Sequence, residues 1–171
     1  MLFRFAADTH QGRGPRTFVE PLKKNNMKLT SNFTLEELIH SNTAKNKGID
    51  NTPNQEALDN LTRLAKEVLQ PIRTAWGKPL IVSSGFRCYR LNQAVRGAAN
   101  SDHRYGAAAD IHTLSNYASD NQKLFNLIVK MASEGKIHCR QIIDEYGYKW
   151  VHVSINHPKN LERHNQILHL K

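Results

Sequence analysis

The chain has 171 residues, 39 % of them hydrophobic and 23 % charged, which is typical of a globular protein with one domain and its own core. No apolar run approaches the roughly 20 residues that a transmembrane helix needs, so we expect no membrane insertion. The formal net charge is +9, and the lysines and arginines are scattered along the chain. This distribution disfavours specific nucleic-acid binding, and it favours either a basic surface that aids solubility or attraction to an anionic polymer.

The first part of the chain differs from the rest. We expect residues 1–26 to be a flexible, basic N-terminal extension, because the Gly-Arg-Gly-Pro sequence at 12–15 breaks any regular element. The apolar stretch 1–7 is too short for a secretory signal, and Asp8 interrupts it. The sequence therefore predicts a protein made in the cytoplasm without a clear signal peptide, with its folded domain over residues 27–171.

Helical signals dominate the start of this domain. Thr34 and Glu37 form a capping box that begins a short helix, and residues 43–53 are predicted to be a polar loop. Apolar residues at three- and four-residue steps then predict an amphipathic helix, which Pro71 is expected to kink or reset. The stripe consists of Leu58, Leu61, Leu64, Ala65, Val68 and Ile72.

Short apolar and β-branched runs dominate the second half and predict strands. A further amphipathic helix among them is expected to end at Gly135. This order favours an α+β fold with a small, mostly antiparallel sheet, helices packed on one side and the site on the other. The predicted elements are strands 80–84, 107–111, 141–145, 150–155 and an edge strand 165–170, a helical turn 91–95, and a helix 124–132.

A set of metal ligands is the clearest chemical signal. His103 and Asp110 lie seven positions apart, separated by Gly106 and three alanines that let a loop run tightly into a strand. His152 lies downstream between two valines, so its side chain points to the opposite face of its strand from theirs. Two histidines and one aspartate with a vacant fourth position form the ligand set of a catalytic zinc site.

Other histidines compete for this assignment. His112 shares a strand face with Asp110 and is the one credible rival ligand. The remaining histidines have no partners at metal-ligand spacing, namely His10, His40, His138, His157, His164 and His169.

Five motifs follow one another between residue 32 and residue 154. They are Phe33-Thr34-Leu35-Glu36-Glu37, Ser84-Gly85-Phe86-Arg87, the Ser101-x-His103-x-x-Gly106-x-Ala108-x-Asp110 pattern, Gln141-Ile142-Ile143-Asp144-Glu145 and Trp150-Val151-His152-Val153-Ser154. In this order they resemble the motifs of the zinc D-Ala-D-Ala carboxypeptidase-like family of phage and bacterial cell-wall peptidases. The resemblance implies a hedgehog/DD-peptidase-like fold and a zinc peptidase domain with Zn2+ as its cofactor.

Four further residues receive expected roles. Glu145, on the strand before His152, is predicted to be the general base, whereas some branches of the family place the acid at the position that is Lys149 here. Arg87 is expected to bind a substrate carboxylate or to stabilise an oxyanion. Ser101 is a candidate substrate-binding residue, and Gln141 is a candidate for orienting substrate or a ligand.

The resemblance implies a peptidase that hydrolyses an amide bond next to a D-amino acid in peptidoglycan, either as a carboxypeptidase or as an endopeptidase. The alternatives are a catalytically inactive wall-recognition module with the same metal site, and a basic nucleic-acid binder. We expect a peptidoglycan peptide as the partner and a monomer, acting on the cell wall after lysis or through a secretion or injection system. Cys88 and Cys139 are expected to be free thiols, with a disulfide as the alternative.

Overall fold

The computed structural model describes residues 27–160 and 162–171. The predicted extension, residues 1–26, lies outside these residues. Helices dominate the first part of the described chain, up to Trp76. Helix α1 (Leu35–Ile39) begins at the predicted capping box, in which the Thr34 side chain accepts from the Glu37 backbone N–H and the Glu37 carboxylate accepts from the Thr34 N–H. The expected loop at 43–53 was wrong in part, because α2 (Asn42–Lys47) occupies its start between an N-cap at Ser41 and a left-handed C-cap at Gly48.

The long amphipathic helix runs without a break in helical structure from α3 (Gln55–Leu64) to α4 (Gln70–Trp76). The segment η2 (Ala65–Leu69) between them is a π-helix, one turn before Pro71. Proline lacks an N–H and its ring collides with a carbonyl of the preceding turn, so the wider π turn lets the chain pass the proline without ending the helix. The sequence predicted that Pro71 would kink or reset the helix, and the structure has a π-helical segment before the proline with the helix continuing beyond it.

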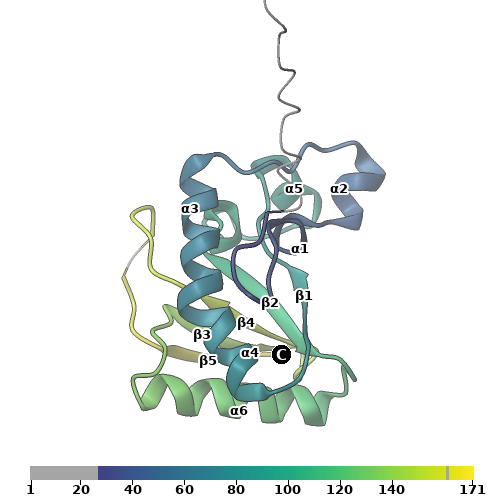
Figure 1. The fold of residues 1–171 in the computed structure, drawn as a ribbon. Helices are drawn as coiled ribbons and strands as arrows, with labels where there is room; N and C mark the ends of the chain where they lie inside the picture. Colours follow the sequence, from purple (N-terminus) through teal and green to yellow (C-terminus); the bar gives the residue numbers. More distant parts are fainter. Residues whose placement is uncertain (1–26, 161) are drawn as a thin grey trace, which may run out of the picture.

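Five strands form one sheet in the order β1-β2-β4-β3-β5. All neighbouring pairs are antiparallel except β3 with β5, which is parallel, and β5 lies at the edge of the sheet as predicted. The predicted α+β class with a mostly antiparallel sheet is confirmed (Figure 1). The strands are β1 (Leu80–Ser84), β2 (Ala108–Thr113), β3 (Gln141–Glu145), β4 (Trp150–Ser154) and β5 (Gln166–Leu170).

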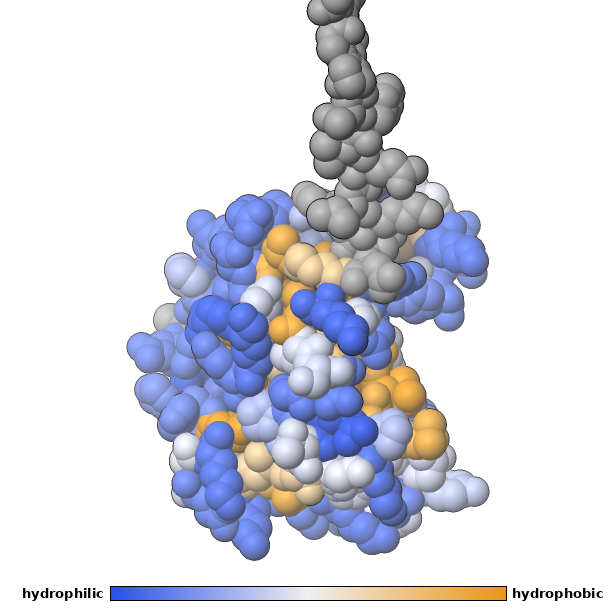
Figure 2. All heavy atoms as spheres, in the orientation of Figure 1, coloured by the Kyte–Doolittle hydropathy of each residue, from blue (hydrophilic) through white to orange (hydrophobic). Residues whose placement is uncertain are grey.

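One face of the sheet packs against the helical layer. Alternate residues of the central strands, including Ile111, Val151 and Val153, are fully buried in a single core with apolar side chains of α3, α4 and α6 (Ala118–Ser133). The outer surface of this layer is mainly hydrophilic, with scattered hydrophobic side chains (Figure 2). None of the helices within 27–160 and 162–171 combines the length and apolar character needed to cross a membrane.

The other face of the sheet is not left bare, which refines the expected one-sided packing. Residues of the α1–α2 connection and the end of α5 (Tyr89–Ala94) form walls above it. The 3-10 helix η3 (Asp102–Tyr105) enters between α5 and β2 and ends at Gly106 in the left-handed conformation, with φ of 68°. These segments convert the polar face of the sheet into a groove.

Candidate metal centre

Strand pairing brings two of the predicted ligands together. Asp110 on β2 lies directly opposite His152 on β4, and side chains of directly opposed residues in an antiparallel pair share a face. Their neighbours Ile111 and Val151 point into the core instead. The third predicted ligand, His103, comes from η3, which delivers it to the same face from outside the sheet.

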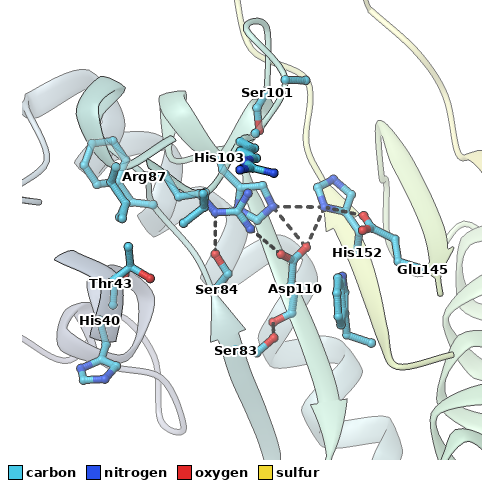
Figure 3. Close-up of a pocket in the computed structure, with 18 of the residues that line it drawn as sticks. His40, Thr43, Ser83, Ser84, Arg87, Ser101, His103, Asp110, Glu145 and His152 are labelled. Carbon is cyan, nitrogen blue, oxygen red and sulfur yellow. Dashed lines mark hydrogen bonds and ion pairs between the residues drawn. The ribbon is translucent and has the colours of Figure 1, made fainter. Parts of the chain in front are cut away.

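The three donor atoms form a small triangle (Figure 3). Asp110 Oδ1 lies 2.9 Å from His152 Nδ1 and 3.1 Å from His103 Nε2, and the two ring nitrogens are 3.2 Å apart. All three side chains are buried. Tetrahedral zinc bonds of about 2.0–2.2 Å would separate neighbouring ligand atoms by about 3.3–3.6 Å, so this donor set fits Zn2+ with small side-chain adjustments.

A backbone carbonyl fixes the orientation of His103. Its Nδ1 lies 2.6 Å from the Gly85 carbonyl oxygen, which can only accept, so Nδ1 carries the hydrogen and a neutral ring keeps a lone pair on Nε2 for the metal. Glycine is required at position 85 for a different reason, because a Cβ there would lie 2.1 Å from the carbonyl oxygen of Leu38, whose backbone packs against this segment. Thus the Ser84-Gly85-Phe86-Arg87 motif supports the metal site through its backbone as well as its side chains.

Arg87 lies against the ligand set. Its Nη2 is 2.7 Å from Asp110 Oδ2, the carboxylate oxygen that does not face the histidines, and its Nε donates to Ser84 Oγ at 2.8 Å. The guanidinium therefore orients the ligand carboxylate, a contact that the sequence did not suggest (Figure 3). Arg87 also lines the groove, with 19 % of its side chain exposed, so its predicted contact with substrate stays a prediction.

Burial and the charges of neighbouring groups together shift the pKa values of the three predicted ligands. Burial lowers the pKa of His103. Burial also opposes the charged form of His152, but its hydrogen bond and charge interaction with Asp110 outweigh this effect and raise its pKa. For Asp110 the cost of burial is outweighed by the two histidines, which hold the pKa of its carboxyl far below its usual range. The aspartate is therefore anionic and ready to bind a cation at any physiological pH.

Glu145 faces the same space. Its Oε1 lies 4.0 Å from His152 Nδ1, and 20 % of its side chain is exposed. Burial, together with the nearby Asp110 charge, raises the pKa of its carboxyl. The adjacent Asp144 points to the other side of β3, as expected, where it accepts from the Tyr148 N–H and pairs with His169.

An open groove of about 740 Å³ surrounds these groups. Ser101 and Trp150 line it, and the role of Ser101 in substrate binding stays a prediction. Gln141 does not line it: its amide accepts from Arg140 and donates to Gln166, away from the metal ligands. His112 bonds the neighbouring Thr113 carbonyl and is not part of the triangle.

A second buried cluster, which the sequence did not reveal, lies behind η3. Asp102 pairs with Arg140 at 2.8 Å and accepts from His157 at 3.1 Å and from Asn160 at 2.6 Å. These partners lie 38 to 58 positions away along the chain, so no local motif marks them. The cluster joins η3, the start of β3 and the segment after β4, and it thereby fixes the turn that carries His103.

The two cysteines are separate free thiols. Cys139 is buried, and burial raises the pKa of its thiol to about 12. Cys88 caps α5, its sulfur accepting from the Leu91 N–H at 3.4 Å.

An open α+β sheet that holds two imidazoles and a carboxylate at the floor of a groove defines a metal-binding domain with the donor set of a zinc enzyme. Residues 31–154 match the model of the Peptidase M15 family, and the chain belongs to that family. The predicted family is thereby confirmed.

The chain is also similar to a zinc D-Ala-D-Ala carboxypeptidase of Streptomyces albus G, with 38 % identity over 100 residues. That match covers 57 % of this chain and 38 % of the other protein, so the chain spans well under half the length of this relative. Family, relative and donor set together confirm Zn2+ as the predicted cofactor.

Proposed function

We propose that this protein is a zinc peptidase that hydrolyses an amide bond next to a D-amino acid in peptidoglycan, with Glu145 as its general base. The observation that carries the proposal is the triangle of His103, Asp110 and His152 with the Glu145 carboxylate beside it in an open groove. The name of the Streptomyces relative supports a D-Ala-containing substrate.

Each residue of the site has a defined task in this proposal. His103, Asp110 and His152 would hold the zinc ion, which would supply Lewis acidity toward the scissile carbonyl and toward water. Glu145 accepts the proton of the attacking water and passes it to the leaving amine. Its raised pKa makes the carboxylate a stronger base for the first step, and the protonated group can still donate to the leaving amine, which is more basic than a carboxylate. Arg87 holds Asp110 in its liganding orientation.

The groove supports a peptide as substrate. Its walls come from the α1–α2 connection, the end of β1, α5 and the β3–β4 hairpin, so it continues past the metal ligands on more than one side. The volume of the groove lies within the range of about 300–1,000 Å³ that is usual for ligand sites, so it is sufficient for a short peptide. We propose the cell wall as the place of action, either for trimming stem peptides or for opening cross-links.

Replacing Glu145 by glutamine tests the assignment of the base. Zinc-loaded protein is incubated with purified peptidoglycan, and the release of new amino groups is followed. We expect Glu145→Gln to lower the rate about 100- to 10,000-fold, because the amide cannot accept the proton. Glu56→Gln, on the exposed first turn of α3 and outside the groove, is the matched control and should keep the full rate.

Two outcomes would contradict the proposal. Full activity of Glu145→Gln would remove this residue from the mechanism. Binding of the wild-type protein to peptidoglycan without zinc-dependent release of amino groups would favour the inactive recognition module instead. Mass analysis of the released fragments identifies the bond that is cut, and so separates a carboxypeptidase from an endopeptidase.

A further inference from the structure

Two arginines line the groove, Arg87 and Arg96, and the structure assigns them different roles. Arg87 uses Nη2 and Nε for Asp110 and Ser84, at 2.7 and 2.8 Å. Its positive charge is opposed at close range by the ligand carboxylate. A guanidinium with two of its nitrogens engaged in this way has a reduced capacity for the bidentate contact by which arginine recognises a carboxylate.

Arg96 differs in each of these respects. It lies just after α5 on the groove wall and is exposed. Across residues 27–160 and 162–171, no hydrogen bond or ion pair involves its guanidinium. The acidic residues that line the groove are Asp110 and Glu145, and both belong to the metal site. The Arg96 charge is thus available to a ligand.

The backbone at Arg96 is held in an unusual conformation. Its φ is 56°, in the left-handed region, which disfavours an L residue with a long side chain by about 1–2 kcal/mol relative to glycine. The fold by itself would be served better by glycine or asparagine at this position. A groove-facing cation at a position where the backbone disfavours it indicates a role outside folding.

A buried amide fixes this turn. Asn92 is 2 % exposed. Its side-chain Nδ2 donates to the backbone carbonyls of Gly97 and Ala98 at 3.2 and 2.9 Å, and its backbone carbonyl accepts from the Gly97 N–H at 2.8 Å. A Cβ at Gly97 would lie 2.2 Å from Asn92 Oδ1, so glycine is required there. The base of the Arg96 side chain is therefore held rigidly at the groove wall.

We propose that Arg96 is a specificity-determining residue that binds a carboxylate of the peptide substrate from the wall of the groove. This inference rests on the proposed function. The carboxylate belongs either to the C-terminus of the peptide or to one of its side chains, and the two share the same chemistry. An anionic peptide is then preferred over a neutral one of the same length.

The test compares Arg96→Asn with Arg90→Asn, since Arg90 is an exposed arginine of α5 that does not line the groove. Asparagine tolerates the left-handed backbone, so the first substitution should leave thermal unfolding unchanged. The substrates are a D-Ala-D-Ala peptide with a side-chain carboxylate, the same peptide with its C-terminus amidated, and the same peptide with its side chain amidated. Initial rates of hydrolysis measured over a range of peptide concentrations give kcat and KM separately.

We expect Arg96→Asn to lower kcat/KM for the fully anionic peptide about 10- to 100-fold, mainly through a higher KM. Against the peptide that lacks the recognised carboxylate, wild type and variant should be equal, and this equality identifies which carboxylate is bound. Arg96→Lys, which keeps the charge without the bidentate fork, should lie between them. Equal losses on all three peptides, no loss, or the same loss in Arg90→Asn would overturn the proposal.

Calorimetric binding of the same peptides to zinc-loaded Glu145→Gln protein separates this inference from the proposed function. If wild-type protein cleaves none of the peptides, the peptidase proposal fails, yet a carboxylate preference in binding that disappears on adding Arg96→Asn would still support the arginine. Binding that does not depend on Arg96 in any peptide would overturn the inference even in an active enzyme.

Discussion

Protonation of His152 competes with the metal for the same nitrogen. Asp110 raises the pKa of this imidazole, and an imidazolium has no lone pair to donate. Because the raised pKa lies above the usual value, protons compete at higher pH than for an ordinary histidine. As pH falls through this pKa, zinc affinity should fall by about tenfold per pH unit for each proton displaced.

Competition with a chromophoric chelator between pH 8 and pH 6 measures this effect. His112→Gln is the matched control, because His112 lies on the same strand but bonds the Thr113 carbonyl instead of facing the metal site. That variant should show the same slope as the wild type. An affinity that stays constant over this range would show that His152 is not a ligand.

The two thiols differ in their surroundings, and this difference should be visible in solution. Burial raises the pKa of Cys139 to about 12, so at pH 8 it holds almost no thiolate, the reactive form. Cys88 is partly exposed. With an aromatic disulfide reagent at pH 8 we expect one thiol to react in the native protein and the second only in denaturant. Cys88→Ser should abolish the native reaction; two rapidly reacting native thiols would contradict the buried position of Cys139.

Individual residues differed in how far sequence could assign them. The ligand candidates His103 and Asp110 were recognised from their spacing and from the small residues between them, which form a local motif. Arg87 was recognised as important, but its contact with Asp110 spans 23 positions and depends on how β1 pairs with β2. Gln141 lies in a recognised motif, and only the arrangement of Arg140 and Gln166 directs it away from the groove.

At the scale of elements, η3 depends on a buried ion pair between its first residue, Asp102, and Arg140, which lies outside the element. Asp102 and Arg140 are 3 % and 6 % exposed in their side chains, and removing one partner leaves the other charge buried. We therefore expect Asp102→Ala to lower the free energy of unfolding by about 3–5 kcal/mol. Denaturant unfolding of the zinc-free protein measures this loss directly.

The matched control is Asp120→Ala. Asp120 also pairs with a basic residue, Lys123, but the pair lies at the surface, where solvent screens it. This change should alter stability very little. Equal effects of the two substitutions would show that the cluster behind η3 does not hold the turn.

Elements with strong local signals were predicted well, and those shaped by their neighbours were not. The capping box at Thr34 and the strand pattern of β3 both appear at the expected positions. Helix α2 was missed because its sequence is polar and its one buried residue, Ala44, gives no periodic stripe. The π turn before Pro71 was not foreseen in detail, since it is the packing of α3 and α4 on one core that keeps the helix continuous.

For the whole molecule, the metal should act as a link between distant segments. Its predicted ligands come from η3, β2 and β4, which only the folded state brings together. Zinc should therefore bind the folded state and not the unfolded one, and this stabilises the fold. At a free zinc concentration about 100-fold above Kd, the free energy of unfolding should increase by about 2.7 kcal/mol, which corresponds to a rise in Tm of roughly 5–10 °C.

Differential scanning calorimetry with zinc, with magnesium and with chelator tests this expectation. Magnesium prefers oxygen ligands and should leave Tm unchanged. In Asp110→Asn the zinc-dependent rise should shrink or vanish. A Tm that zinc does not raise in the wild-type protein would mean that the triangle of donors does not bind the ion.

The sequence by itself determined what depends on neighbouring residues: helix starts, strand alternation, the spacing of His103 and Asp110, and the motifs that resemble a peptidase family. Local sterics and the periodicity of side chains encode these features, so they can be recognised in a linear chain. The tertiary structure decided the rest. The distances of 2.9–3.2 Å between the donors, the contact of Arg87 with Asp110, the cluster around Asp102 and the place of Arg96 on the groove wall all depend on segments that only folding brings together. Such contacts depend on strand register and on how loops close over the sheet, and no local pattern records them.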